Sequence, residues 1–155
     1  LGLGVGVSQI HYVAGYKYVT TQSVELQLPY AHGTWSRVIC GQRGELATLN
    51  PTGLLTIEAG YAWDGPSGPA IDTPDFMGAS LVHDVLYQMI RLGQLPEGWR
   101  KFADEIMWQL CRGAGMSRIR AAWCYYGVRE GAGFAARPSA EPKERTAPLV
   151  LMETR

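Results

Sequence analysis

The segment Ser80-Leu81-Val82-His83-Asp84-Val85-Leu86-Tyr87 decides where this chain changes from strands to helices. From Asp75 onward, apolar side chains recur at a spacing of three to four residues, which is typical of a helix with one buried face. Asp75 is a suitable N-cap, and Gly93 ends the pattern. We therefore predict a helix over 76–92 that carries an imidazole and a carboxylate side by side.

Two more helices are predicted after the first. Trp99–Arg112 has helical periodicity and is followed by Gly113 and Gly115. Ser117 is placed to cap a third helix, from Arg118 to about residue 130, which further glycines end. The short connection over 94–98 favours antiparallel packing of the first two helices.

The residues before the first helix are predicted to form strands. Val24, Leu26 and Leu28 alternate with Glu25 and Gln27, as expected for a half-buried strand. Turn residues separate four strand candidates: 16–28, 35–40, 45–49 and 54–58. The following segment, 59–75, is too rich in Gly and Pro for a regular element, and an ordered loop of this kind is often functional.

The predicted fold class is α+β. A small antiparallel β lobe (16–58) and a loop (59–75) precede a three-helix lobe (76–130), all within one domain over 16–134. Residues 1–15 are predicted to be an N-terminal arm, and the proline-containing residues 135–155 an extended C-terminal tail. We expect the tail to lie on a partner or on a neighbouring copy of the chain.

Composition narrows the classes of partner. The chain has 155 residues, with 14 basic and 14 acidic side chains, so it has no global charge to attract nucleic acid. Three separated cysteines without a CxxC pair predict buried thiols in a reducing compartment, not a zinc knuckle or a disulfide framework. No apolar run reaches the roughly 18 residues that a membrane span needs.

A histidine–carboxylate pair is the main site candidate. A helical wheel places His83 on the apolar face and turns Asp84 toward Ser80, Gln88 and Arg91. Asp104 lies at the edge of the buried arc of the second helix and can approach His83 if the helices are antiparallel. A carboxylate can then orient the imidazole while the other ring nitrogen activates water. The alternative is a buried histidine that only satisfies a structural acid.

The loop offers oxygen ligands for a cation. Asp64 stands in Trp63-Asp64-Gly65-Pro66-Ser67, where it either binds a metal or caps a turn. Asp72 and Asp75 are interpreted as turn and cap residues. Tyr87, one turn after His83, is expected to be a buried aromatic residue whose hydroxyl contacts a loop or an acid.

These motifs in order resemble a family of small phage and prophage proteins of unassigned function. The resemblance covers residues from about 54 to 130: the loop Gly60-Tyr-Ala-Trp-Asp-Gly-Pro-Ser, the segment His83-Asp-Val-Leu-Tyr, and Ala103-Asp104. It implies an origin in a tailed phage, a prophage or a related particle. The location implied is the virion, assembled in the bacterial cytoplasm, where the two arms would contact other virion proteins or copies of the chain.

A looser resemblance is to the core of calcium-dependent secreted phospholipase A2 enzymes. It rests on a glycine-rich loop, a helix with His83-Asp84 and Tyr87, and a later helix with Asp104. It implies that His83 activates water and that Asp104 orients His83. It also implies that Asp84 binds Ca²⁺ together with carbonyls near Trp63, Gly65 and Ser67, with Asp64 as an additional acid.

Two functions therefore stand side by side. One is a hydrolase of a phospholipid ester or another cell-envelope bond, based on His83 and Asp104, with or without Ca²⁺. The other is a structural or adaptor component of a phage particle, in which the polar cluster is an internal staple.

Overall fold

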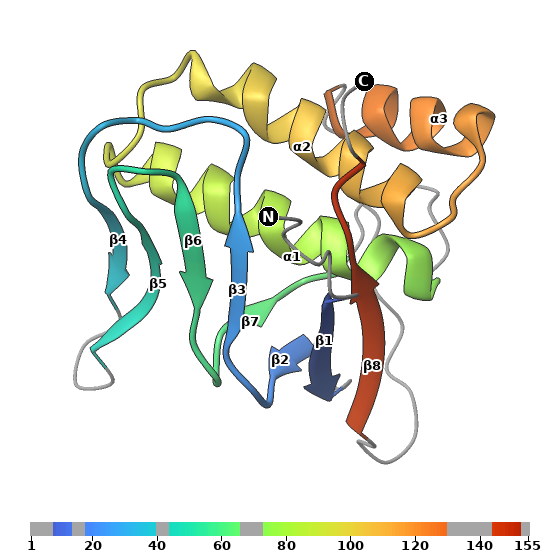
Figure 1. The fold of residues 1–155 in the computed structure, drawn as a ribbon, viewed down its shortest axis with the longest axis horizontal. Helices are drawn as coiled ribbons and strands as arrows, with labels where there is room; N and C mark the ends of the chain where they lie inside the picture. The colour runs from blue at the N-terminus through green and yellow to red at the C-terminus, as the bar shows by residue number, and fades with distance from the viewer. Residues whose placement is uncertain (1–7, 14–17, 40–43, 66–72, 130–143, 153–155) are drawn as a thin grey trace, which may run out of the picture.

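The computed structural model confirms the α+β class: the residues that it describes form two antiparallel sheets of four strands each, and three helices (Figure 1). It describes residues 8–13, 18–39, 44–65, 73–129 and 144–152. The strands are β1 (Ser8–Val13), β2 (Tyr18–Thr20), β3 (Val24–Gln27), β4 (Ser36–Ile39), β5 (Glu45–Leu49), β6 (Leu54–Ile57), β7 (Ala62–Trp63) and β8 (Glu144–Leu149). The helices are α1 (Pro74–Arg91), α2 (Trp99–Gly113) and α3 (Arg118–Arg129).

One sheet contains most of the predicted β lobe, in the order β3-β6-β5-β4. Its alternation is as predicted: Val24 and Leu26 are buried, whereas Glu25 and Gln27 are exposed. Asn50 closes the turn between β5 and β6, because its Oδ1 accepts hydrogen bonds from the backbone N–H groups of Thr52 and Leu54.

The other sheet, in the order β7-β2-β1-β8, differs from the prediction. The single strand expected over 16–28 is two strands in different sheets, because the chain bends at 21–23 between β2 and β3. A short strand, β7, also lies inside the segment expected to be an irregular loop, where it pairs with β2.

The predicted arms contain two neighbouring strands of this second sheet, the inner strand β1 and the edge strand β8. β1 pairs antiparallel with β8 from Ser8 opposite Leu149 to Val13 opposite Glu144. Residues 144–149 of the predicted tail therefore take hydrogen bonds from β1 of the same chain, and contact of the tail with another molecule stays a prediction. Ile10, Ala147 and Leu149 are buried in the core, which accounts for the pairing.

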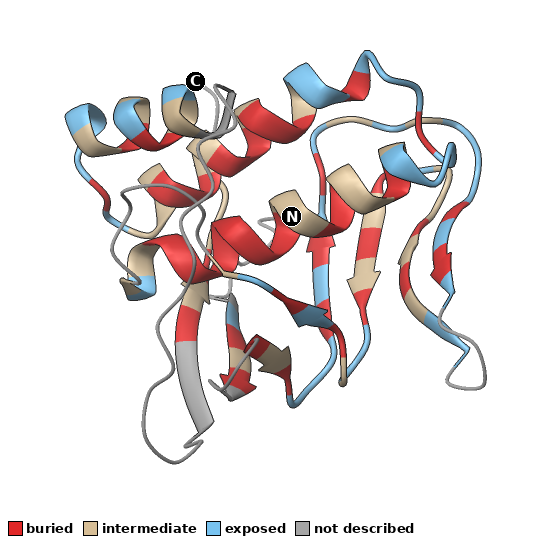
Figure 2. Ribbon diagram, turned by 180° about the vertical axis from the view of Figure 1, so that it is seen from behind, coloured by how far each residue is buried: buried red, intermediate tan, exposed pale blue. Residues whose placement is uncertain are grey.

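α1 is the central element of the core. It packs against α2, β8 and β4, and both views show it between the strands and α2 (Figures 1 and 2). Its buried side chains include Phe76, Leu81, Val85 and Met89, which cover more than one face. None of the helices in the described ranges is both long and apolar enough to cross a membrane.

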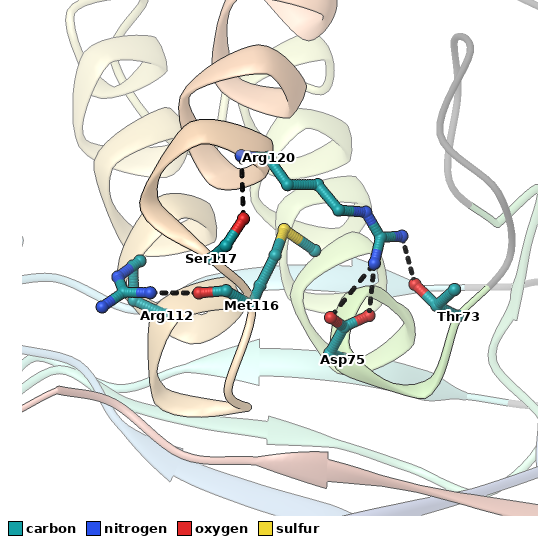
Figure 3. Close-up of polar contacts among 6 residues, drawn as sticks. All are labelled: Thr73, Asp75, Arg112, Met116, Ser117 and Arg120. Atoms are coloured by element: carbon teal, nitrogen blue, oxygen red, sulfur yellow. Dashed lines mark hydrogen bonds and ion pairs between the residues drawn. The ribbon is translucent and has the colours of Figure 1, made fainter.

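α3 is fixed to the beginning of α1 by polar contacts (Figure 3). Arg120 Nη1 lies 3.2 Å from Asp75 Oδ2, and Arg120 Nη2 donates to the Thr73 hydroxyl. Asp75 is therefore not the N-cap that was predicted: Thr73 occupies that position, and Asp75 lies in the first turn. Ser117 does cap α3, since its Oγ accepts the Arg120 backbone N–H at 3.3 Å.

Candidate functional site

His83 on α1 and Asp104 on α2 meet, as their positions on two antiparallel helices predicted. Nε2 of His83 lies 2.9 Å from Oδ1 of Asp104. Asp104 is 2% exposed, whereas the His83 side chain retains 12% of its surface in contact with solvent. The pair thus has a buried acid on one side and a partly accessible imidazole on the other.

Tyr87 completes this pair from one turn further along α1. Its hydroxyl donates to the same Asp104 Oδ1 at 2.8 Å, and its ring lies 4.1 Å from the His83 ring, centroid to centroid. A buried carboxylate is costly unless donors surround it, and here two donors converge on one oxygen. The expectation that the Tyr87 hydroxyl would contact an acid is confirmed.

The contact with Asp104 decides which ring nitrogen of His83 is available for chemistry. A carboxylate only accepts, so Nε2 must be the protonated nitrogen in the hydrogen bond. In the neutral imidazole, Nδ1 then carries the lone pair. This is the arrangement that a general base requires, with the acid fixing both the tautomer and the orientation of the ring.

Asp84 belongs to a second, adjacent polar cluster. The hydroxyl of Tyr61 lies 2.9 Å from Asp84 Oδ2 and 2.6 Å from Gln88 Oε1, and it can donate its single proton to only one of them at a time. Burial raises the pKa of Asp84, and the neighbouring Asp64 raises it further, while Tyr61, Arg91 and His83 oppose the increase. Burial, with the charge of Asp84 next, also raises the pKa of Tyr61.

The remaining predicted metal ligands are only partly brought together. Asp64 is exposed but acts electrostatically on Asp84, so the two carboxylates are neighbours. Trp63 is buried, and its indole N–H donates to the Ser80 hydroxyl at 3.1 Å. Gly65 has a positive φ of 82° and packs over the Tyr18 ring. Ser67 and Asp72 lie outside the described residues.

Side chains alone do not build a metal centre in the described part of the chain. No group of three or more His, Cys, Asp or Glu side chains there is arranged to hold a metal ion. Asp84 and Asp64 provide two carboxylates, and a hard cation would take its other oxygen ligands from backbone carbonyls or water. Both described cysteines, Cys111 and Cys124, are free thiols and buried, as predicted.

Sequence reasoning missed Tyr61 as a site residue. Its position in the glycine-containing loop before β7 carried no signal of a role, because the contact with Asp84 depends on how the loop folds over α1. The sequence did indicate that Gln88 would lie near Asp84, since the helical wheel placed both residues on the same side of α1. Ser80, expected on that side too, instead bonds to Trp63.

Comparison with known proteins adds no identification: neither family models, curated proteins nor solved structures yielded a match to this chain.

Proposed function

We propose that this protein is a hydrolase in which His83 is the general base and Asp104 orients it. The observation that supports this most strongly is the convergence on Asp104 Oδ1 of His83 Nε2 at 2.9 Å and the Tyr87 hydroxyl at 2.8 Å. This leaves Nδ1 as the basic atom on an imidazole that is partly exposed. Tyr87 is a positioning residue, because it acts on Asp104.

The proposed chemistry is the addition of water to an ester carbonyl. A water molecule at Nδ1 of His83 loses a proton to that nitrogen as its oxygen attacks the carbonyl carbon. The imidazolium that forms is stabilised by the Asp104 carboxylate, which stays ionised. Collapse of the tetrahedral intermediate expels the alcohol, which takes the proton back from Nδ1.

Calcium remains part of the proposal at Asp84 and Asp64. Two neighbouring carboxylates, one of them with a raised pKa, are the kind of site in which a bound divalent cation relieves repulsion. When bound, Ca²⁺ would supply positive charge to the developing oxyanion. Tyr61 would hold Asp84 in place through its hydroxyl.

The substrate and the setting rest on the sequence resemblances. We propose a phospholipid ester, or another bond of the cell envelope, as the substrate. We propose a tailed-phage particle as the setting, with contacts to virion proteins or to other copies of the chain. Mass spectrometry of purified phage particles tests whether they contain this protein, and so tests the setting separately from the chemistry.

The chemistry is tested by hydrolysis of nitrophenyl esters and phospholipid vesicles, with and without Ca²⁺. His83→Gln and Asp104→Asn should each lower kcat/KM by about 100-fold or more, because the base or its orientation is lost. Tyr87→Phe should lower kcat by about tenfold or less and leave KM unchanged, since only the position of Asp104 is affected.

His32→Gln is the matched control. The His32 ring contacts Trp99 and the Thr34 hydroxyl and has no part in the dyad. Circular dichroism should show that every variant is folded. Wild-type rates in His83→Gln, or no hydrolysis of any of these esters by the unaltered protein, would contradict the hydrolase.

The structural staple is the second candidate, and one observation favours it: the His83 ring is mostly covered and stacks on Tyr87. A staple predicts that His83→Ala lowers the free energy of unfolding by about 1–3 kcal/mol, since it removes a donor to the buried Asp104, with no change in any reaction rate. Measuring stability and rate on the same variants therefore separates the two functions.

A further inference from the structure

A second concave site lies between α2 and α3. It is a cavity of about 390 Å³, a volume at the lower end of the range for small-molecule sites. The residues that line it are Glu105, Trp108, Gln109, Ala122, Tyr125 and Tyr126. Three of these six are aromatic and one is an acid, while none is basic.

The two tyrosines form a corner of this cavity. Their ring centroids are 5.5 Å apart and the ring planes are inclined at 84°, so they present nearly perpendicular walls. Trp108 comes from α2 and adds a third aromatic wall.

Glu105 provides a negative charge at the same place. Its Oε2 accepts a hydrogen bond from the Tyr30 hydroxyl at 3.3 Å, which holds the carboxylate in position. Lys101 lies beside it, with its Nζ 3.9 Å from Oε1, but the Lys101 side chain is 71% exposed, so this pair is weak and solvated. The carboxylate therefore keeps its capacity to attract a cationic ligand.

The walls are held in place before any ligand arrives. α3 is capped by Ser117 and joined to the beginning of α1 through Arg120 and Asp75 (Figure 3). A preformed cavity does not spend binding free energy on ordering its walls.

We propose that this cavity binds an alkylammonium cation, with a quaternary ammonium group such as that of choline as the best fit. The faces of Trp108, Tyr125 and Tyr126 attract a cation through their quadrupoles, and Glu105 supplies the counter-charge. An anion would be repelled by Glu105, and a purely apolar ligand would leave the carboxylate desolvated without a partner. His83 and Asp104 do not line this cavity, and the inference does not depend on the proposed hydrolysis.

The test is direct binding to the full chain by isothermal titration calorimetry or ligand-observed NMR. Choline should bind at least about tenfold more tightly than 3,3-dimethyl-1-butanol, which has the same shape without the charge. Equal affinity for choline and for this neutral analogue would overturn the proposal. Binding of neither choline nor phosphatidylcholine vesicles would also overturn it.

Variants locate the site. Glu105→Gln and Trp108→Leu should each weaken choline binding by about tenfold, because they remove the counter-charge and one aromatic face. Tyr126→Leu, at an exposed position, serves if Trp108→Leu does not fold. Trp123→Leu is the matched control: Trp123 is 50% exposed on α3 and does not line the cavity, so binding should be unchanged. Wild-type affinity in both Glu105→Gln and Trp108→Leu would overturn the assignment.

A quaternary ammonium group can come from a free metabolite or from a lipid headgroup. Phosphatidylcholine vesicles and phosphatidylglycerol vesicles separate the two sources. Binding to free choline identifies a soluble ligand, and binding only to phosphatidylcholine vesicles identifies a headgroup. Either result supports the proposed site if Glu105→Gln weakens the binding. Stronger binding to phosphatidylglycerol vesicles contradicts the proposed site.

Discussion

Asp104, His83 and Tyr87 constrain one another. The buried Asp104 carboxylate is stable only while donors reach it, and His83 Nε2 and the Tyr87 hydroxyl both donate to its Oδ1. The orientation of His83 depends on Asp104 in turn. A substitution at any of the three therefore changes the other two, and effects on stability and on reaction rate must be measured together.

Asp84 leads to a prediction about pH. Burial raises its pKa above the ordinary value of 3.8. In the pH range between 3.8 and the raised value, the folded protein binds more protons than the unfolded chain, so stability falls as pH rises through that range. Asp84→Asn removes this effect. We expect the variant to gain stability relative to the unaltered protein between pH 4 and pH 7, as measured by urea unfolding.

Glu97→Gln is the control for this experiment, because the Glu97 side chain is 82% exposed. It should show no comparable gain across the same pH range. A relative stability of Asp84→Asn that stays constant or falls with rising pH would show that burial does not disfavour the Asp84 carboxylate. A partly buried acid that costs stability at neutral pH is typical of a residue kept for function.

Much of the candidate site follows from spacing. Residues four apart on a helix lie on one face, so His83 and Tyr87 had to be neighbours. A short connection between α1 and α2 favoured the approach of Asp104. Tyr61 could not be predicted in this way, because it reaches Asp84 from a loop 23 positions earlier in the chain, and that contact is decided by tertiary packing.

At the scale of elements, the helices were easier to predict than the strands. Gly93 and Gly115 have positive φ values of 69° and 96°, and they end α1 and α2 where the sequence indicated. A strand has no comparable local stop signal when the chain passes from one sheet to another. The bend between β2 and β3 contains only Thr21, Gln22 and Ser23, without Gly or Pro, so the two strands were predicted as one.

The contact between α3 and α1 can be measured by a double-mutant cycle. Asp75→Ala, Arg120→Ala and the double variant should give a coupling free energy of about 1 kcal/mol by urea unfolding, because both side chains are partly buried. Arg120→Ala alone should cost more than Asp75→Ala alone, since Arg120 also donates to Thr73.

Glu97 and Arg100 form the control pair for the cycle. They are 3.7 Å apart and largely exposed, so their coupling should stay below about 0.5 kcal/mol. If the coupling of Asp75 and Arg120 is no larger than this, α3 is held by packing and not by the ion pair.

For the whole molecule, the main lesson concerns the two ends of the described chain. β1 and β8 are each other's partners, although more than 100 positions separate them. Charged residues and Pro148 made the second segment look like a tail, and glycines made the first look like an arm. Pairing between distant strands depends on what each buries in the assembled core, which local patterns do not reveal.

The segment after β8 packs against α2 at Gly113, where α2 has no side chain. A substitution at Gly113 therefore tests the whole arrangement. A Cβ atom added at Gly113 would lie 1.9 Å from the carbonyl oxygen of Val150, so the two backbones would have to separate. Gly113→Ala should therefore lower the free energy of unfolding by about 2 kcal/mol.

Gly127→Ala is the control: nothing lies within 4 Å of its added Cβ, and alanine in a helix should raise stability by about 0.5–1 kcal/mol. Urea unfolding measures both changes, and limited proteolysis should cut Gly113→Ala faster near Leu151. If Gly113→Ala is as stable as the unaltered protein, the C-terminal segment does not pack on α2 in this way.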